Sequence, residues 1–210
     1  MNKNMKMVPR ILSEKASPQI AVSTDFTLND AERNKEIHSK LWAKVSEVIK
    51  EDERNLFYRV GDSYNGWYAG YDKRIGLLYY LVRIKRLNKK LSGTTVTQTL
   101  VWRWPGNKLS TDITKNVIFD ILLHRYPAIM SDSLQTKDGG QFWKRLLALA
   151  SDKNYHIGLL NFNTREVIVP KEDEDVAEFI IRVEKDSWGD LGSYSAVRFI
   201  ISNNPIIPTK

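Results

Sequence analysis

The chain contains no cysteine. This absence excludes a disulfide framework, thiolate metal sites and a cysteine nucleophile, and it fits a reducing compartment. Long apolar runs are missing as well. No segment approaches the length of a membrane span, and residues 1–10 are basic without the apolar stretch of a signal peptide. We therefore expect a soluble, cytoplasmic protein that does not contact a membrane.

Three widespread site motifs are also absent. The sequence has no Gly-x-x-x-x-Gly-Lys-Ser/Thr, no Gly-x-Gly-x-x-Gly and no His-Glu-x-x-His. Its three histidines, His38, His124 and His156, are far apart in the sequence, and no spacing of Asp or Glu joins them into a ligand set. We expect no metal site.

What the chain does have is enough apolar material for a core. Hydrophobic residues make up 42% of its 210 residues, and six of these residues are tryptophan. This length favours one domain, which we expect to span residues 27–203 between a flexible N-terminal arm at 1–26 and a tail at 204–210. The net charge of +7 raises the odds of an anionic partner, such as nucleic acid or a nucleotide, but many ordinary intracellular proteins are equally basic and the charge alone favours that simpler reading.

Hydrophobic periodicity predicts an α+β domain. An amphipathic helix is expected from about residue 30 to residue 50, with Ile37, Leu41, Val45 and Val48 along one stripe. The pattern then predicts strands at 56–60, 67–71, 75–87 and 94–104, a helix at 110–126, a strand at 128–131, a helix at 136–150, two strands within 155–169, a helix at 173–185 and a strand at 194–202. This order indicates one mixed, mostly antiparallel sheet flanked by helices, with one parallel step.

One junction has the form of an anion site. The predicted strand at 94–104 runs into Arg103-Trp104-Pro105-Gly106-Asn107-Lys108, and a helix capped by Ser110 or Thr111 follows. The first N–H groups of a helix have no partners inside the helix, so a glycine-containing turn that opens a helix commonly binds phosphate.

The element order and two local sequences resemble the GNAT superfamily of N-acyltransferases. Residues 67–76, Trp-Tyr-Ala-Gly-Tyr-Asp-Lys-Arg-Ile-Gly, look like the hairpin between that family's second and third strands. Arg103-x-x-Gly106-x-Lys108 is similar to its pyrophosphate loop, Arg/Gln-x-x-Gly-x-Gly/Ala, at the same strand-to-helix junction. The resemblance covers roughly residues 31–169 and rests more on topology than on motif. Lys108 departs from the small final residue, and Pro105 removes one N–H.

This resemblance implies a GNAT-like fold that transfers an acyl group from acetyl-CoA or another acyl-CoA to an amine acceptor, mainly by positioning and proton transfer. It implies the following cofactor-binding residues: Arg103, Trp104, Gly106, Asn107, Lys108, Ser110 and Thr111. Asp132, at the end of the short strand, is the candidate base, and Ser131 or Ser133 is the candidate proton donor. The alternative for Asp132 and Ser133 is that they cap a turn.

A non-catalytic role is the second hypothesis. The densest basic run contains Arg83, Lys85, Arg86, Lys89 and Lys90. Cationic side chains interleaved with aromatic rings on a sheet can follow phosphates and stack bases, so this run predicts a module that binds nucleic acid. A GNAT-like shell that binds a protein partner remains open as well. A V-shaped gap between strands 94–104 and 128–131 would favour the enzyme, and continuous pairing there would favour a binding role.

Overall fold

The computed structural model of the chain describes residues 28, 30–62, 64–91, 93–104, 109–131, 137–161, 165–188 and 197–208. The arm predicted at residues 1–26 lies outside these residues.

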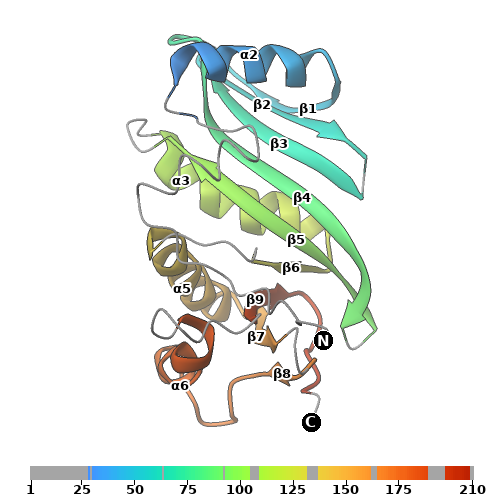
Figure 1. The fold of residues 1–210 in the computed structure, drawn as a ribbon, viewed down its shortest axis with the longest axis vertical. Helices are drawn as coiled ribbons and strands as arrows, with labels where there is room; N and C mark the ends of the chain where they lie inside the picture. Colours follow the sequence, from blue (N-terminus) through green and yellow to red (C-terminus); the bar gives the residue numbers. More distant parts are fainter. Residues whose placement is uncertain are drawn as a thin grey trace, which may run out of the picture.

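Nine described strands form one mixed sheet in the order β1-β2-β3-β4-β5-β6-β9-β7-β8 (Figure 1). Their bounds are β1 Val45–Glu51, β2 Asn55–Gly61, β3 Asn65–Asp72, β4 Leu77–Leu91, β5 Thr94–Arg103, β6 Ala128–Met130, β7 His156–Asn161, β8 Val167–Ile168 and β9 Val197–Ser202. All described pairs are antiparallel except β5 with β6, which run parallel. The predicted α+β class, with its single parallel step, is confirmed.

Helices cover both faces of this sheet. Their bounds are α2 Ala31–Trp42, α3 Leu109–Asn116, the π-helical segment η1 Val117–Leu122, α4 Leu123–Arg125, α5 Lys137–Asp152 and α6 Val176–Trp188. Alternate residues of β2 point to opposite faces, and they separate the two cores. Tyr58 packs in a cluster with Ile37 of α2, whereas Phe57 belongs to the larger cluster that holds Phe119, Trp143 and residues of α6.

The helix predicted for residues 30–50 is half wrong, because α2 ends at Trp42 and β1 begins at Val45. Val45 and Val48 fit a helical stripe, but in the structure they belong to a strand in which half-buried and exposed residues alternate up to Lys50. Val48 is 46% exposed, so it does not belong to a buried stripe. Pairing with β2 decides the conformation of this segment, and the local pattern does not contain that information.

A buried amide fixes α2 to the sheet. Asn34 is fully buried, and its side-chain amide donates to the carbonyl oxygens of Leu28 (3.0 Å) and Leu78 (2.8 Å). Its Oδ1 accepts from the Leu78 N–H at 2.6 Å. Asn34 thus pairs with both backbone groups of a β4 residue, as a neighbouring strand would.

Candidate functional site

β5 and β6 pair only briefly. Residues 96–98 of β5 are in register with residues 128–130 of β6, and the Thr99 hydroxyl still donates to the Met130 carbonyl at 3.2 Å. β5 then continues to Arg103, whereas β6 has ended. Figure 1 shows the two strands diverging towards their C-terminal ends. β6 thus pairs with β5 along its whole length, and the segment that would form the second arm of a V-shaped gap, residues 132–136, lies outside the described residues. The gap that would favour an enzyme stays a prediction.

Beyond the last residue of β6, Ser131 keeps the chain hydrogen-bonded to β9. Its N–H donates to the Phe199 carbonyl at 2.9 Å, and its Oγ accepts from the Phe199 N–H at 3.1 Å. The chain therefore stays bound to β9 while it leaves β5. With 1% of its surface exposed and its hydroxyl engaged in the sheet, Ser131 is suited to a structural role rather than to proton donation. The other two candidate catalytic residues, Asp132 and Ser133, lie outside the described residues.

Arg103 ends β5 on the face that carries α5. Its side chain is exposed, and its guanidinium carbon lies 5.3 Å from the centre of the Phe142 ring of α5. The next residue, Trp104, donates its N–H to the Tyr79 carbonyl at 3.0 Å, and its half-buried ring packs against both large core clusters. Trp104 therefore contributes to the core at the end of β5, while Arg103 remains available to a ligand.

The central part of the predicted phosphate loop lies outside the described residues, namely Gly106, Asn107 and Lys108. Helix α3 begins at Leu109, so Ser110 and Thr111 belong to its first turn and are not the caps that the sequence predicts. The first-turn N–H groups of a helix lack partners within the helix. The structure thus places a helix N-terminus soon after the end of β5, which the sequence pattern predicts.

Tyr80 is a buried polar side chain at this end of the sheet that the sequence pattern does not reveal. It is the register partner of Arg103, and its hydroxyl is buried beside the side chain of Thr114. Burial raises the pKa of this phenol, and nearby Thr114 and Arg103 act in the opposite direction. The hydroxyl has no access to solvent, so we assign Tyr80 to packing. In the sequence, Tyr79-Tyr80 is an ordinary aromatic pair in a strand.

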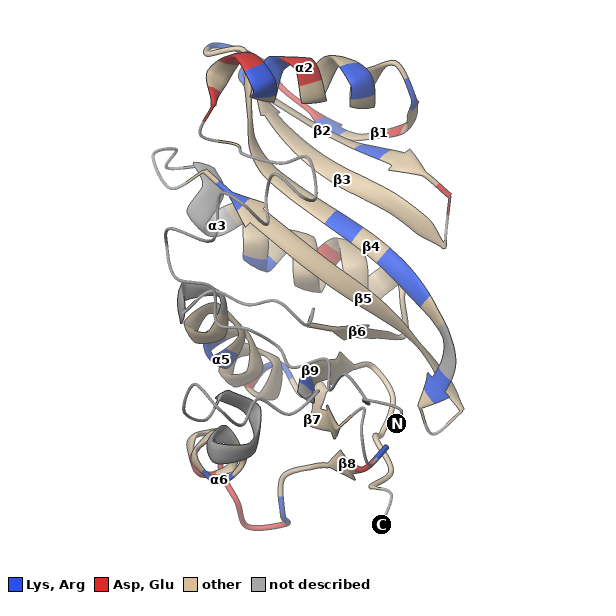
Figure 2. Cartoon of the chain, viewed as in Figure 1, with Lys and Arg blue, Asp and Glu red and all other residues tan. Residues whose placement is uncertain are grey.

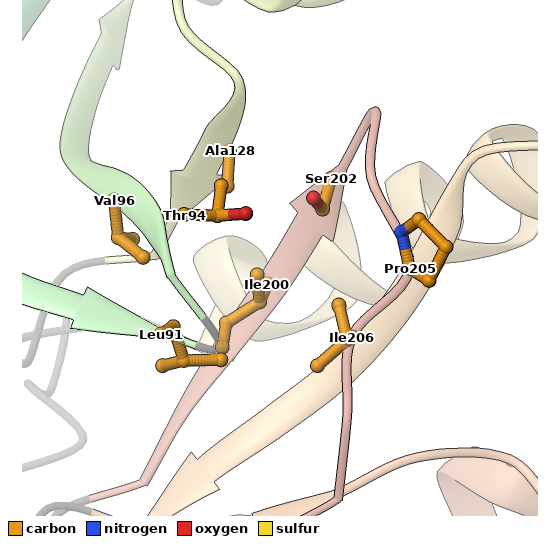
Figure 3. Close-up of a pocket in the computed structure, with 8 residues that line it drawn as sticks. All are labelled: Leu91, Thr94, Val96, Ala128, Ile200, Ser202, Pro205 and Ile206. Carbon is orange, nitrogen blue, oxygen red and sulfur yellow. The ribbon is translucent and has the colours of Figure 1, made fainter.

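A small pocket lies at the opposite end of the β5–β6 pair (Figure 3). Its wall includes Val96 and Ala128, the first register pair of the two strands, together with Ile200 and Ile206. These side chains are apolar, and only the hydroxyls of Thr94 and Ser202 add polarity to the lining (Figure 3). The pocket lies away from Arg103 and offers no charge to a phosphate.

The predicted basic run lies along β4, which Figure 2 shows with blue segments, and the alternation of the strand divides it between two faces. Arg83 and Lys85 are exposed and, two residues apart, share one face. Arg86 points to the other face, where its guanidinium carbon lies 4.7 Å from the centre of the Tyr64 ring. Lys90 is exposed near the end of the strand, and the Lys89 side chain lies outside the described part.

Within the described ranges, no group of three or more His, Cys, Asp or Glu residues could hold a metal ion. The described helices also include none that is both long and apolar enough to cross a bilayer. No family model, curated protein or solved structure matches the chain.

Proposed function

We propose that the protein is an acyl-CoA-dependent N-acyltransferase of GNAT-like fold that acts on an amine acceptor. The observation that carries this proposal is the short β5–β6 pairing, after which β5 continues, paired with β4 only, towards the loop that opens α3. A second function, nucleic-acid binding, would depend on a different face of the sheet.

The chemistry of an acyl-CoA matches the groups at this end of the sheet. Its pantetheine arm carries two amides, which can pair with backbone N–H and C=O groups of β5 between Thr99 and Arg103, as a short strand would. Its phosphates are anionic, and both a guanidinium and a helix N-terminus stabilise negative charge. In this proposal Arg103 and the first turn of α3 hold the phosphates, with Gly106 allowing close backbone approach.

In the transfer step, the amine nitrogen attacks the thioester carbonyl carbon, and the carbon–sulfur bond breaks. The amine loses one proton, and the departing thiolate takes one. Asp132 remains the proposed base. Holding the amine and thioester together supplies much of the rate enhancement, because it makes a bimolecular step effectively unimolecular.

Calorimetric titration with acetyl-CoA tests this proposal. We expect saturable binding, which Arg103→Glu weakens at least ~10-fold because it replaces a charge-assisted contact by repulsion. The matched control is Lys35→Glu, which makes the same charge change at an exposed position of α2, and it should leave the affinity unchanged. Absence of binding to the unmodified chain at millimolar acetyl-CoA, or equal affinities for all three proteins, would refute the proposal.

A further inference from the structure

A part of the sheet outside the proposed transferase site presents aromatic rings and positive charge together. We call it the central face and define it by Trp67 of β3, Arg83 and Lys85 of β4, and Leu100 and Trp102 of β5. Trp67, Arg83 and Leu100 lie in register across the three strands. These residues point to the same side as the α2 core, with which Trp67 and Trp102 pack, whereas Arg103 points to the other side.

The two indole rings of the central face lie close together without being fully buried. The Trp67 and Trp102 ring centres are 5.9 Å apart at an angle of 34°, and both side chains are half-buried. The exposed guanidinium of Arg83 lies 5.5 Å from the Trp67 ring centre. A partly exposed indole with a cation beside it can stack a flat ring and contact the phosphate attached to it.

The charged residues of β4 and β5 are all basic. No aspartate or glutamate occurs between Asp72 and Asp112, so β4 and β5 contain only basic charges, as Figure 2 shows. Asp72, at the end of β3, is fully buried and accepts two hydrogen bonds from Arg54. The strands of the central face therefore supply no exposed carboxylate to neutralise Arg83 and Lys85.

We infer that the central face binds single-stranded nucleic acid. A single strand offers unstacked bases to the indoles and phosphates to Arg83 and Lys85, whereas a duplex keeps its bases stacked and paired. An acidic peptide would satisfy the two charges but would leave the rings without flat partners. This inference is independent of the proposed transferase, because it concerns the opposite face from Arg103.

Fluorescence anisotropy with a labelled oligothymidylate of about 12 nucleotides tests the inference, because one sheet-based module covers this length. Affinity should fall as salt rises from about 50 to 200 mM. The Arg83→Gln/Lys85→Gln variant should bind more weakly, and its slope of log K against log salt should be shallower by about 1.4, since each phosphate contact on a single strand contributes about 0.7. Trp67→Leu should weaken binding about 5- to 150-fold through lost stacking.

Matched variants separate this site from general attraction by a basic protein. Lys115 of α3 and Arg145 of α5 are exposed and belong to helices on the other face of the sheet from α2, so Lys115→Gln/Arg145→Gln removes the same charge elsewhere and should leave affinity and slope unchanged. Trp67→Phe keeps an aromatic ring and should retain most of the binding. This variant tests the role of the ring even if the Trp67→Leu variant fails to fold.

Four results would overturn the inference. These are absence of binding at low salt, equal loss in the matched control, tighter binding to the duplex of the same length, and equal affinity for a sulfated polysaccharide with no effect of Trp67→Leu. Acetyl-CoA titration of Arg83→Gln/Lys85→Gln should match that of the unmodified chain, so failure here and failure of the transferase proposal are distinguishable.

Discussion

Replacing Asn34 by alanine should destabilise the fold by about 3 kcal/mol. The change removes three hydrogen bonds between α2, residue 28 and β4, each worth about 1 kcal/mol net in a folded protein. It also leaves the N–H and carbonyl of Leu78 without their side-chain partner in a buried position, where desolvated polar groups are costly. For a chain of this length, that loss corresponds to a fall in Tm of roughly 6–12 °C.

Urea unfolding, followed by tryptophan fluorescence, measures this change at equilibrium. The control is Asn116→Ala, because Asn116 is an exposed helical residue and the same substitution there changes only helix propensity, by about 0.5 kcal/mol. The difference between the two variants reports the buried hydrogen bonds. A loss below about 1 kcal/mol for Asn34→Ala, with an unchanged m value, would show that α2 is not held in this way.

Other polar side chains lead to predictions that differ with their burial. Arg182 donates two hydrogen bonds of 2.6 Å to Glu174 and lowers the pKa of the Glu174 carboxyl from 4.5 to about 2. The stabilisation from this ion pair is complete above pH 4.5 and is lost as the pH falls towards 2. In urea unfolding, Glu174→Gln should therefore cost about 1 kcal/mol at pH 7 and almost nothing near pH 2. Equal costs at both pH values would contradict this. Arg54→Ala should cost about 3 kcal/mol in thermal unfolding, because it leaves the fully buried Asp72 carboxylate without two hydrogen bonds from a cation. Asp72→Asn should cost less, and a larger loss for Asp72→Asn than for Arg54→Ala would contradict this reasoning. Tyr80→Phe should destabilise the fold by about 1 kcal/mol, because it removes the buried hydroxyl that interacts with Thr114, and a gain in stability would contradict this.

The antiparallel strands β2 to β5 could be predicted because their signals are local. Alternating apolar residues mark each strand, and short segments rich in turn formers, such as residues 61–66, separate them. The helix after β5 could be predicted as well, since Ile113, Val117 and Ile121 recur at helical spacing. In these segments the local preference and the tertiary contacts agree.

Features that depend on distant partners could not be predicted in this way. Val45 and Val48 satisfy the helical period, and only pairing with β2 makes their segment a strand. The partner of Ser131 is Phe199, far along the chain, so no local pattern identifies its hydroxyl as part of the sheet. The pairing of the chain just after β6 also depends on β9, because Ser131 bonds to Phe199 of β9 and not to β5.

Amide hydrogen exchange with and without acetyl-CoA tests the proposed transferase most directly, because it shows where the ligand binds. We expect slower exchange in peptides that cover residues 99–116 and 128–137, with α2 and the C-terminal residues 200–208 unchanged. Unchanged exchange at saturating acetyl-CoA, or protection confined to another part of the chain, would contradict it.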